Sequence, residues 1–212
     1  MIRDRSSPTG DTDAPTAGDP VVTPEATDLR VIDEYLGLPD SLIEPVYRLV
    51  ERCFEPQKTR SAFQHTYTLD QWTEMVNHPS FYAAVAWHAG AAVGFTGFET
   101  DPARAKLLHP EYFTSRFPGQ RIYYCTDLAI HPDHRHLGVI EDICRAGADF
   151  ARRGRARVVF YASESTIRSG LIDLLANVMG DDLATPITAL DTVQFFTFEV
   201  TNRGEAEVSR DR

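Results

Sequence analysis

One stretch near the middle of the chain, residues 122–153, combines a strand, a tight turn and a helix, and it constrains the fold more than any other. Residues 122–130 read Ile-Tyr-Tyr-Cys-Thr-Asp-Leu-Ala-Ile, and such β-branched and aromatic residues are typical of a strand. After a turn, apolar residues recur at helical spacing over residues 139–151. Residues 152–154 (Arg-Arg-Gly) predict a cationic last turn and the end of this helix.

The turn between the predicted strand and helix favours an anionic ligand. It ends in Gly138, which we expect in the first turn of the helix. The start of a helix leaves backbone N–H groups without partners and carries the positive end of the helix dipole. A phosphate or carboxylate is therefore the expected guest of this loop.

The spacing Ile130-x-Pro132-x-x-Arg135-x-x-Gly138 resembles the pyrophosphate loop of the GNAT acyltransferase superfamily. The family pattern is Arg/Gln-x-x-Gly-x-Gly/Ala after a strand. Arg135 and Gly138 match it, whereas Ile140 stands where the family usually has Gly or Ala. The simpler alternative is an ordinary strand-to-helix turn with a helix-starting glycine.

The resemblance is clearest over Phe81 to Ala162 and extends, by the order of elements, from about residue 29 to 200. It implies a mixed α/β sheet flanked by helices, as in the GNAT fold. We therefore expect one domain over residues 29–200. Residues 1–28 contain few large apolar side chains and predict a disordered tail, and residues 201–212 predict a polar tail.

The same resemblance implies a site for acetyl-CoA or another acyl-CoA as co-substrate. In the GNAT fold two parallel central strands splay apart, and the pantetheine arm bonds to strand backbone as an added strand would. The positions that match the pantetheine-binding strand and the pyrophosphate loop are Leu128, Ala129, Ile130, Arg135, His136, Leu137, Gly138, Val139 and Ile140.

Elements on either side of the central stretch follow from capping patterns and periodicity. We expect strands at 29–36, 81–88, 91–99 and 157–162, the last one buried and parallel to the central strand, and closing strands at 187–190 and 193–200. Ala89-Gly90 predicts a hairpin turn. Capping boxes at Ser41-x-x-Glu44, with Pro45 in the first turn, and at Thr68-x-x-Gln71 predict two helices, the second ended by Pro79, and residues 163–166 predict the cap of a helix that Gly180 closes.

The connection from residue 100 to 120 is long for neighbouring strands and carries several aromatic residues. Such loops are often lids or binding segments. The alternative is a surface helix over residues 103–108 whose neighbouring aromatic side chains pack on the core. Both interpretations stay open at this point.

Composition limits the partners. The chain of 212 residues has 42% hydrophobic and 25% charged residues, a profile typical of soluble globular proteins. Its formal net charge of −10 argues against nucleic acid or an anionic membrane as partner and suits a cationic substrate. The three scattered cysteines predict reduced thiols, and no apolar run predicts a membrane span or signal peptide. We expect a cytoplasmic protein, with a homodimer as one possible state.

Asp127 is the candidate general base. It is the only carboxylate in the predicted central strand, where alternation would place it on one face with Tyr123, Cys125 and Ala129. Apolar surroundings raise a carboxyl pKa, which suits removal of a proton from the attacking amine. Members of the GNAT family often carry an acidic residue in this strand. A structural Asp127, bonded to backbone or to Tyr124, is the alternative.

The general acid is missing from its usual place. GNAT enzymes frequently carry a Tyr in the last helix, four residues before its terminal Gly, and counting back from Gly180 gives Ala176. Tyr161, Ser163, Ser165 or water are the remaining proton donors for the leaving thiolate. Cys125 as an acyl-carrying nucleophile lacks an obvious activating histidine.

A metal is the other chemistry that the central turn could support. His131, Asp133, His134 and His136 are ligand types that suit zinc or nickel. Three rings on one tight turn do not converge easily, so we expect solvated histidines and no metal.

The sequence thus predicts an acyl-CoA-dependent N-acyltransferase, with acetyl-CoA as the default donor and an amine of a small molecule or peptide as acceptor. Two other classes stay open: an acyl-CoA-binding module without turnover, and a related acyl-CoA enzyme such as a decarboxylase or a carrier-protein acyltransferase.

Overall fold

The computed structural model describes residues 29–59, 67–105, 109–135, 138–180 and 186–191. Along these ranges the elements are β1 Leu29–Leu36, α1 Asp40–Phe54, η2 Glu55–Thr59, α2 Leu69–Val76, β2 Phe81–His88, β3 Ala91–Glu99, η3 Pro102–Arg104, α3 Pro110–Arg116, β4 Arg121–Ile130, η4 Pro132–His134, α4 Val139–Gly154, β5 Ala156–Phe160, α5 Glu164–Arg168 and α6 Leu171–Met179. Within these ranges no helix is both long and apolar enough to cross a membrane.

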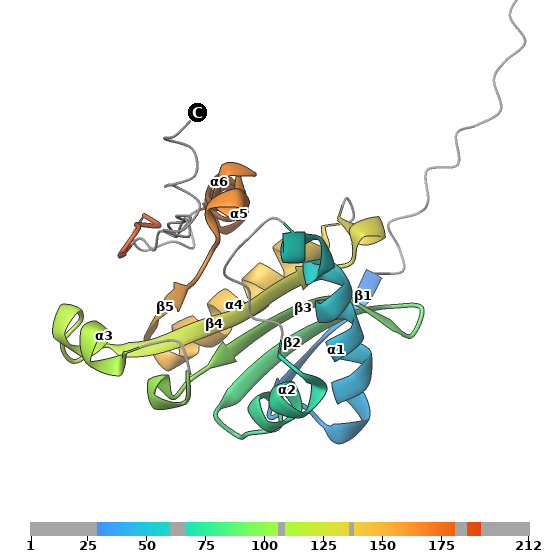
Figure 1. The fold of residues 1–212 in the computed structure, drawn as a ribbon, viewed down its shortest axis with the longest axis horizontal. Helices are drawn as coiled ribbons and strands as arrows, with labels where there is room; N and C mark the ends of the chain where they lie inside the picture. Colours follow the sequence, from blue (N-terminus) through green and yellow to red (C-terminus); the bar gives the residue numbers. More distant parts are fainter. Residues whose placement is uncertain (1–28, 60–66, 106–108, 136–137, 181–185, 192–212) are drawn as a thin grey trace, which may run out of the picture.

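Five strands form one mixed sheet in the order β1-β2-β3-β4-β5. The first four are antiparallel neighbours, and β5 runs parallel to β4. Helices α1 and α2 cover one face of the sheet and α4 covers the other (Figure 1). The mixed α/β sheet flanked by helices is the predicted fold class, which is thereby confirmed.

Apolar side chains fill both faces of the sheet. Between the sheet and helices α1 and α2, the core contains Val46, Leu49, Trp72, Phe81 and Phe95, all at most 4% exposed. Between the sheet and α4 are a second and a third cluster, which include Tyr82, Phe98, Tyr123, Val139 and Ile143. Each fully buried large apolar side chain stabilises the fold by about 1.5–3 kcal/mol relative to exposure, so these faces fix the positions of the strands.

The strand and hairpin predictions at 29–36, 81–88 and 91–99 are confirmed residue by residue. The Thr68–Gln71 capping box is also present, with both reciprocal hydrogen bonds. The box predicted at Ser41 is wrong, because α1 begins at Asp40 after Pro39 and has no side-chain cap, so Pro45 lies inside the helix rather than in its first turn. Pro39 already ends the preceding segment, and the helix starts directly behind it.

The single helix predicted behind the cap at residues 163–166 is two helices. Ser163 does cap α5, accepting a hydrogen bond from the Thr166 backbone N–H at 3.2 Å. Gly170 then adopts φ +89°, which interrupts the helix before α6. An L-residue would be strained in that conformation, so glycine permits the break.

The end of α4 also differs from the prediction. The helix includes Gly154, and Arg155 takes the left-handed conformation with φ 50°. Gly154 serves packing instead: a Cβ there would lie 2.2 Å from the Tyr123 hydroxyl. Its lack of a side chain lets α4 approach β4 closely.

Two predictions near the C-terminus fare differently. Residues 186–191 contain no strand, so the strand predicted at 187–190 is wrong; instead Leu190 lies beside the cluster around Phe113, and its carbonyl accepts from the Tyr112 hydroxyl at 2.9 Å. The strand predicted at 193–200 and both tails lie outside the described residues. Strand β5 is less buried than expected, with Val158 37% exposed.

Candidate active site

Strands β4 and β5 stop pairing halfway along β4. They pair from Arg121 with Ala156 to Cys125 with Phe160. Strand β4 then continues to Ile130, while the chain leaves β5 toward α5 (Figure 1). From Thr126 onward, no described strand pairs with the edge of β4 that faces away from β3. The parting leaves a stretch of strand edge to which an extended ligand could bond.

A β-bulge lies where the two strands part. Gly97 of β3 pairs with Asp127, but Phe98 pairs with Cys125, so Thr126 is an extra residue in β4. An extra residue reverses the alternation of faces beyond it. Cys125 therefore belongs to the cluster under α4, whereas Asp127 lies on the α1/α2 face.

This corrects the predicted company of Asp127. The carboxylate does not share a face with Tyr123 and Cys125, because the bulge separates them from it. It does share a face with Ala129, which packs in the core under α1 and α2. Opposite it stands Gly97, where a Cβ would meet Phe81 Cζ at 2.4 Å and Thr126 Oγ1 at 2.9 Å.

Asp127 is 8% exposed, and its Oδ2 has no hydrogen-bond partner among the described residues. Burial raises the pKa of Asp127 to about 6, and the Thr126 side chain offsets part of that rise. Tyr67 lies close enough for the carboxylate to affect it: burial first, and then the charge of Asp127, raises the pKa of Tyr67 to about 12. Burial also raises the pKa of Tyr124, with a smaller contribution from Asp127.

The loop after β4 has the backbone geometry of an anion site. Gly138 has φ +73° and directly precedes α4, whose first i-to-i−4 hydrogen bond runs from Asp142 N to Gly138 O at 3.2 Å. The N–H groups of residues 138–141 therefore have no partner within the helix. His136 and Leu137 lie outside the described residues.

Five of the predicted cofactor-binding residues turn their side chains into the protein. Leu128 and Ile130 of β4 pack with Val139 and Ile140 of α4, between the sheet and that helix. Ala129 of β4 packs on the opposite face, against α1 and α2. Hydrogen bonds from these residues to a ligand would come from their backbone atoms. Arg135 is exposed beside the loop, and its charge reaches Cys53, whose pKa burial nevertheless raises on balance.

Two carboxylates, Glu141 and Asp142, occupy the first turn of α4. Glu141 Oε2 is buried without a hydrogen-bond partner among the described residues, and Asp142 binds Arg145 at 3.4 Å. Negative side chains at a helix start interact favourably with the dipole, so they compete with a bound anion.

The other two chemistries considered for this region gain no support. Burial raises the pKa of Cys125 to about 12, which leaves almost no thiolate at neutral pH. His131 and His134 approach to 3.3 Å between their Nδ1 atoms, and His131 Nδ1 accepts from Asp133 N. Within the described ranges, no group of three ligand-type residues could hold a metal ion.

The last helix has no tyrosine along α6, as its sequence requires. Instead a group of hydroxyls lies just beyond β5. Ser163 Oγ is 2.9 Å from Ser165 Oγ and 2.8 Å from Thr166 Oγ1. The Gln57 side chain reaches the same group from η2, at 3.4 Å from Thr166 and 3.5 Å from Ser165.

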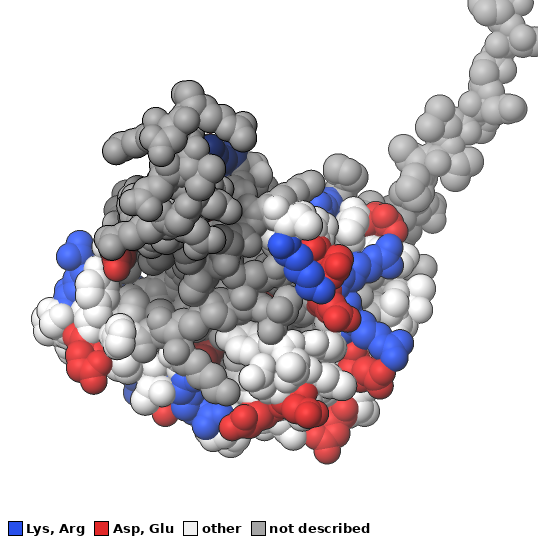
Figure 2. All heavy atoms as spheres, in the orientation of Figure 1, with Lys and Arg blue, Asp and Glu red and all other residues white. Residues whose placement is uncertain are grey.

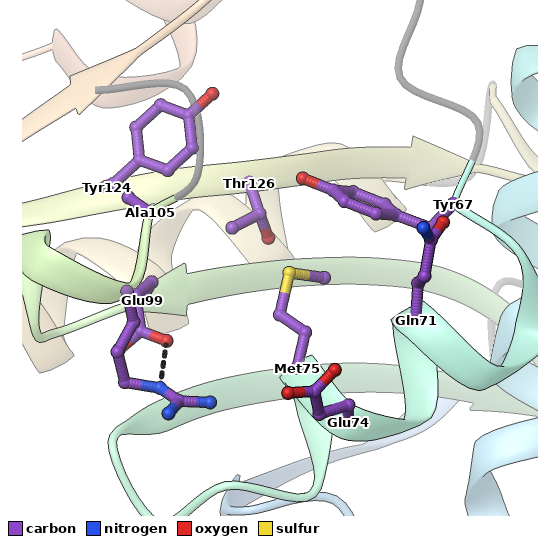
Figure 3. A pocket seen from close by; sticks show the side chains of 9 residues that line it. Tyr67, Gln71, Glu74, Met75, Glu99, Ala105, Tyr124 and Thr126 are labelled. Atoms are coloured by element: carbon purple, nitrogen blue, oxygen red, sulfur yellow. Dashed lines mark hydrogen bonds and ion pairs between the residues drawn. The ribbon is translucent and has the colours of Figure 1, made fainter.

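A pocket opens between α2, β4 and the segment after β3. Strand β4 contributes Tyr124 and Thr126, while residues of α2 and of the segment after β3 form its walls (Figure 3). Its lining residues are Tyr67, Gln71, Glu74, Met75, Glu99, Arg104, Ala105, Tyr124 and Thr126. We call it the α2 pocket.

This pocket could not be predicted from the sequence, because its walls come from three separate segments of the chain. Part of the long connection after residue 100 lines this pocket, through Arg104 and Ala105. Another part packs as in the alternative interpretation, since Phe113 of α3 is buried. The predicted helix at 103–108 is a short η3, Pro102–Arg104, and residues 106–108 lie outside the described ranges.

Comparison with known proteins identifies the family. The sequence profile of the Acetyltransferase (GNAT) family matches residues 43–176, which is more than half of the chain. The chain therefore belongs to the GNAT acetyltransferase family and is an acyltransferase of that type. A search of curated proteins found no match.

Solved structures show the same fold at low sequence identity. An aminoglycoside acetyltransferase from an uncultured soil metagenomic sample, in complex with sisomicin, has 16% identity and a TM-score of 0.51, covering 81% of this chain and 96% of that one. A probable acetyltransferase has 10% identity and a TM-score of 0.51, with coverage of 82% and 100%. AAC(6')-Iy, in complex with the bisubstrate analog CoA-S-monomethyl-acetylneamine, has 14% identity and a TM-score of 0.50, with coverage of 81% and 100%.

Proposed function

We propose that this protein transfers the acetyl group of acetyl-CoA directly to an amine of a small molecule or peptide held in the α2 pocket. The observation that carries the proposal is the position of Asp127. This buried carboxylate lies where β4 leaves β5, and it directly follows Thr126, which lines the pocket. Donor and acceptor would therefore meet beside it.

The donor site in this proposal is made of backbone. The free edge of β4 over Leu128, Ala129 and Ile130 would bond the pantetheine arm, and the loop from Arg135 to Ile140 would hold the pyrophosphate. Gly138 suits that role for two reasons. It takes a left-handed conformation directly before the free N–H groups at the start of α4, and it has no side chain to obstruct a phosphate.

Asp127 is the proposed general base. Acetyl-CoA supplies an activated thioester carbonyl. The amine nitrogen bonds to that carbonyl carbon and gives up a proton to Asp127, directly or through a water, as the carbon–sulfur bond breaks. With a pKa of about 6, the carboxyl is mostly ionised at pH 7 yet more basic than an exposed Asp.

The thiolate that leaves must also be protonated. Ala176 occupies the place of the usual tyrosine, so we assign this step to the hydroxyl group of Ser163, Ser165 and Thr166, to Tyr161, or to water. Their location just beyond the end of β5 supports this assignment. Asp127 then releases its proton to solvent, and the hydroxyl that protonated the thiolate regains one from solvent, so the protons balance.

A second function deserves a test because of Ala176. Without the tyrosine, the same fold could bind acyl-CoA and not turn it over. The deciding experiment measures release of free thiol from acetyl-CoA with a panel of amines, polyamines, aminoglycosides and peptides, alongside CoA binding followed by thermal unfolding.

CoA at a hundredfold over its dissociation constant should stabilise the protein by about 2.7 kcal/mol, or roughly 5–10 °C in Tm. Thiol release with any amine supports the transferase. Stabilisation without thiol release supports the binding module, and folded protein that millimolar CoA does not stabilise contradicts both. The cytoplasmic location and the homodimer stay predictions.

A further inference from the structure

We propose that Gln57 is a latch across the free edge of β4: its contact with α5 closes the way to that edge in the free protein and opens when CoA binds. This inference rests on the proposed function, because it takes the free edge of β4 as the site of the pantetheine arm. It goes further by giving a role to Gln57, a residue of η2 that no sequence motif marks.

The latch joins the two segments that flank this edge. At one end, Cys53 of α1 donates a hydrogen bond from Sγ to the Ile130 carbonyl at 3.2 Å, and η2 follows α1 directly. At the other end, β5 leaves β4 after the pair of Cys125 with Phe160, and the chain continues to α5, beyond the end of β5 (Figure 1). Gln57 connects η2 with α5. An arm laid along the edge between the two anchor points therefore has to pass this connection.

The hydrogen bonds of the latch form a closed ring. The Gln57 amide donates from Nε2 to Thr166 Oγ1 at 3.4 Å and accepts at Oε1 from Ser165 Oγ at 3.5 Å. Each hydroxyl has a single proton to donate. Because the Ser165 proton is used on Gln57, Ser163 must donate to Ser165 at 2.9 Å, and Thr166 must then donate to Ser163 at 2.8 Å. All three hydroxyl protons are thus used within the ring.

Opening the ring at Gln57 changes what α5 can do. The Ser165 hydroxyl loses the amide oxygen that accepts its proton, so it can donate to another group. In the proposed function the thiolate of CoA is such a group. The movement that admits CoA would therefore also release a proton donor near the end of β5.

The ring is weakest at Gln57. Its two bonds are 3.4 and 3.5 Å long, whereas the bonds between the hydroxyls are 2.8 and 2.9 Å long. Longer hydrogen bonds are weaker. Neither η2 nor α5 contains a buried residue, so little apolar packing holds the two segments together. The latch can open at this point while the core stays folded.

Charged groups form no part of the latch. Figure 2 shows acidic and basic side chains intermixed over α1 and the segment after it. The ion pairs of these segments, Arg48 with Glu44 and Lys58 with Glu55, are local. The latch itself consists of one amide and three hydroxyl groups. Because salt screens charges, it should leave the latch unchanged.

Binding of CoA to the full-length protein, measured by surface plasmon resonance and calorimetry, tests the latch. Gln57→Ala should speed association and tighten binding about two- to fivefold, at low and at high salt, because more of the protein is open before CoA arrives. The amides of α5 should exchange faster in the free variant than in the free wild type. Thr59→Ala, exposed in the same η2, is the matched control and should change none of these quantities.

Ser165→Ala breaks the same ring from the other side. It should tighten CoA binding as Gln57→Ala does, and the two changes together should give no further gain, because they open one latch. Ser169→Ala is the control on α5, since the Ser169 hydroxyl bonds only to the Thr166 carbonyl among the described groups and is exposed. Thermal unfolding confirms that each variant is folded.

The outcomes separate this inference from the proposed function. Unchanged or weaker CoA binding in folded Gln57→Ala and Ser165→Ala overturns the latch while the CoA site stands, because a side chain that holds CoA or only supports the fold loses affinity when removed. An equal gain in Thr59→Ala also overturns it. If the wild-type protein does not bind CoA at all, the donor site of the proposed function fails, and the latch fails with it.

Discussion

Replacing Asp127 by Asn should make the protein more stable and less active at the same time. The side chain is 8% exposed, and burial raises its pKa from 3.8 to about 6. Asn keeps the shape of the side chain and removes the buried charge. If Asp127 is the general base, turnover should fall by about a hundredfold or more, because its proton-accepting group is gone.

The size of the gain follows from the pKa. The rise from 3.8 to about 6 corresponds to about 3 kcal/mol lost from the free energy of unfolding once the carboxyl is ionised. Because the folded-state pKa is the higher one, the native protein binds more protons than the unfolded chain between these two values. Wild-type stability from this group is therefore complete below pH 3.8 and is lost as pH rises through 6.

Urea unfolding of both proteins at pH 4, 6 and 8 measures this dependence. Asp127→Asn should match the wild type near pH 4 and exceed it by up to about 3 kcal/mol at pH 8. Turnover is measured on the same preparations. A mutant that is less stable than wild type at pH 8, with normal turnover per folded molecule, would show a structural Asp127 and refute the reasoning.

Three further predictions concern the loop and the pH profile. Gly138→Glu should abolish CoA binding, measured by calorimetry, because it adds bulk and negative charge at the phosphate. The control is Gly119→Glu, at a similar φ of +74° in the turn before β4, which should bind CoA normally. Equal losses of CoA binding in the two variants would contradict the assignment of the loop to the phosphate. Glu141→Gln should tighten CoA binding about two- to fivefold by removing a charge that competes for the helix start, and weaker binding would place the phosphate elsewhere. Wild-type kcat should rise with pH through an apparent pKa near 6, which Asp127→Asn removes; an unchanged profile in the mutant would assign that pKa to another group.

Local sequence patterns predicted most of the helices and strands of the fold. The hairpin at Ala89-Gly90 was predictable because turn residues stand between two apolar runs, and Ala89 and Gly90 do take the left-handed conformations that the turn needs. The break at Gly170 was missed because apolar residues keep helical spacing across it. Periodicity reports which side chains face the core, and it does not report the φ of one residue.

The candidate site was only partly predictable. Asp127 and the Gly138 loop lie in one continuous motif, so the sequence places them together. The face on which Asp127 lies could not be predicted, because strict alternation assumes that no residue is inserted, and Thr126 is inserted. The α2 pocket depends on the distance between α2 and the segment after β3, which no local pattern encodes.

The early end of β5 has a consequence for handling the protein. From Thr126 to Ile130, β4 has an edge that no described strand covers, and a bare strand edge can template pairing with another chain. If CoA bonds to that edge, it should reduce aggregation by blocking strand pairing, in addition to serving as a reactant. Protein purified with CoA should then resist aggregation on storage, and hydrogen exchange at those amides should slow when CoA is added.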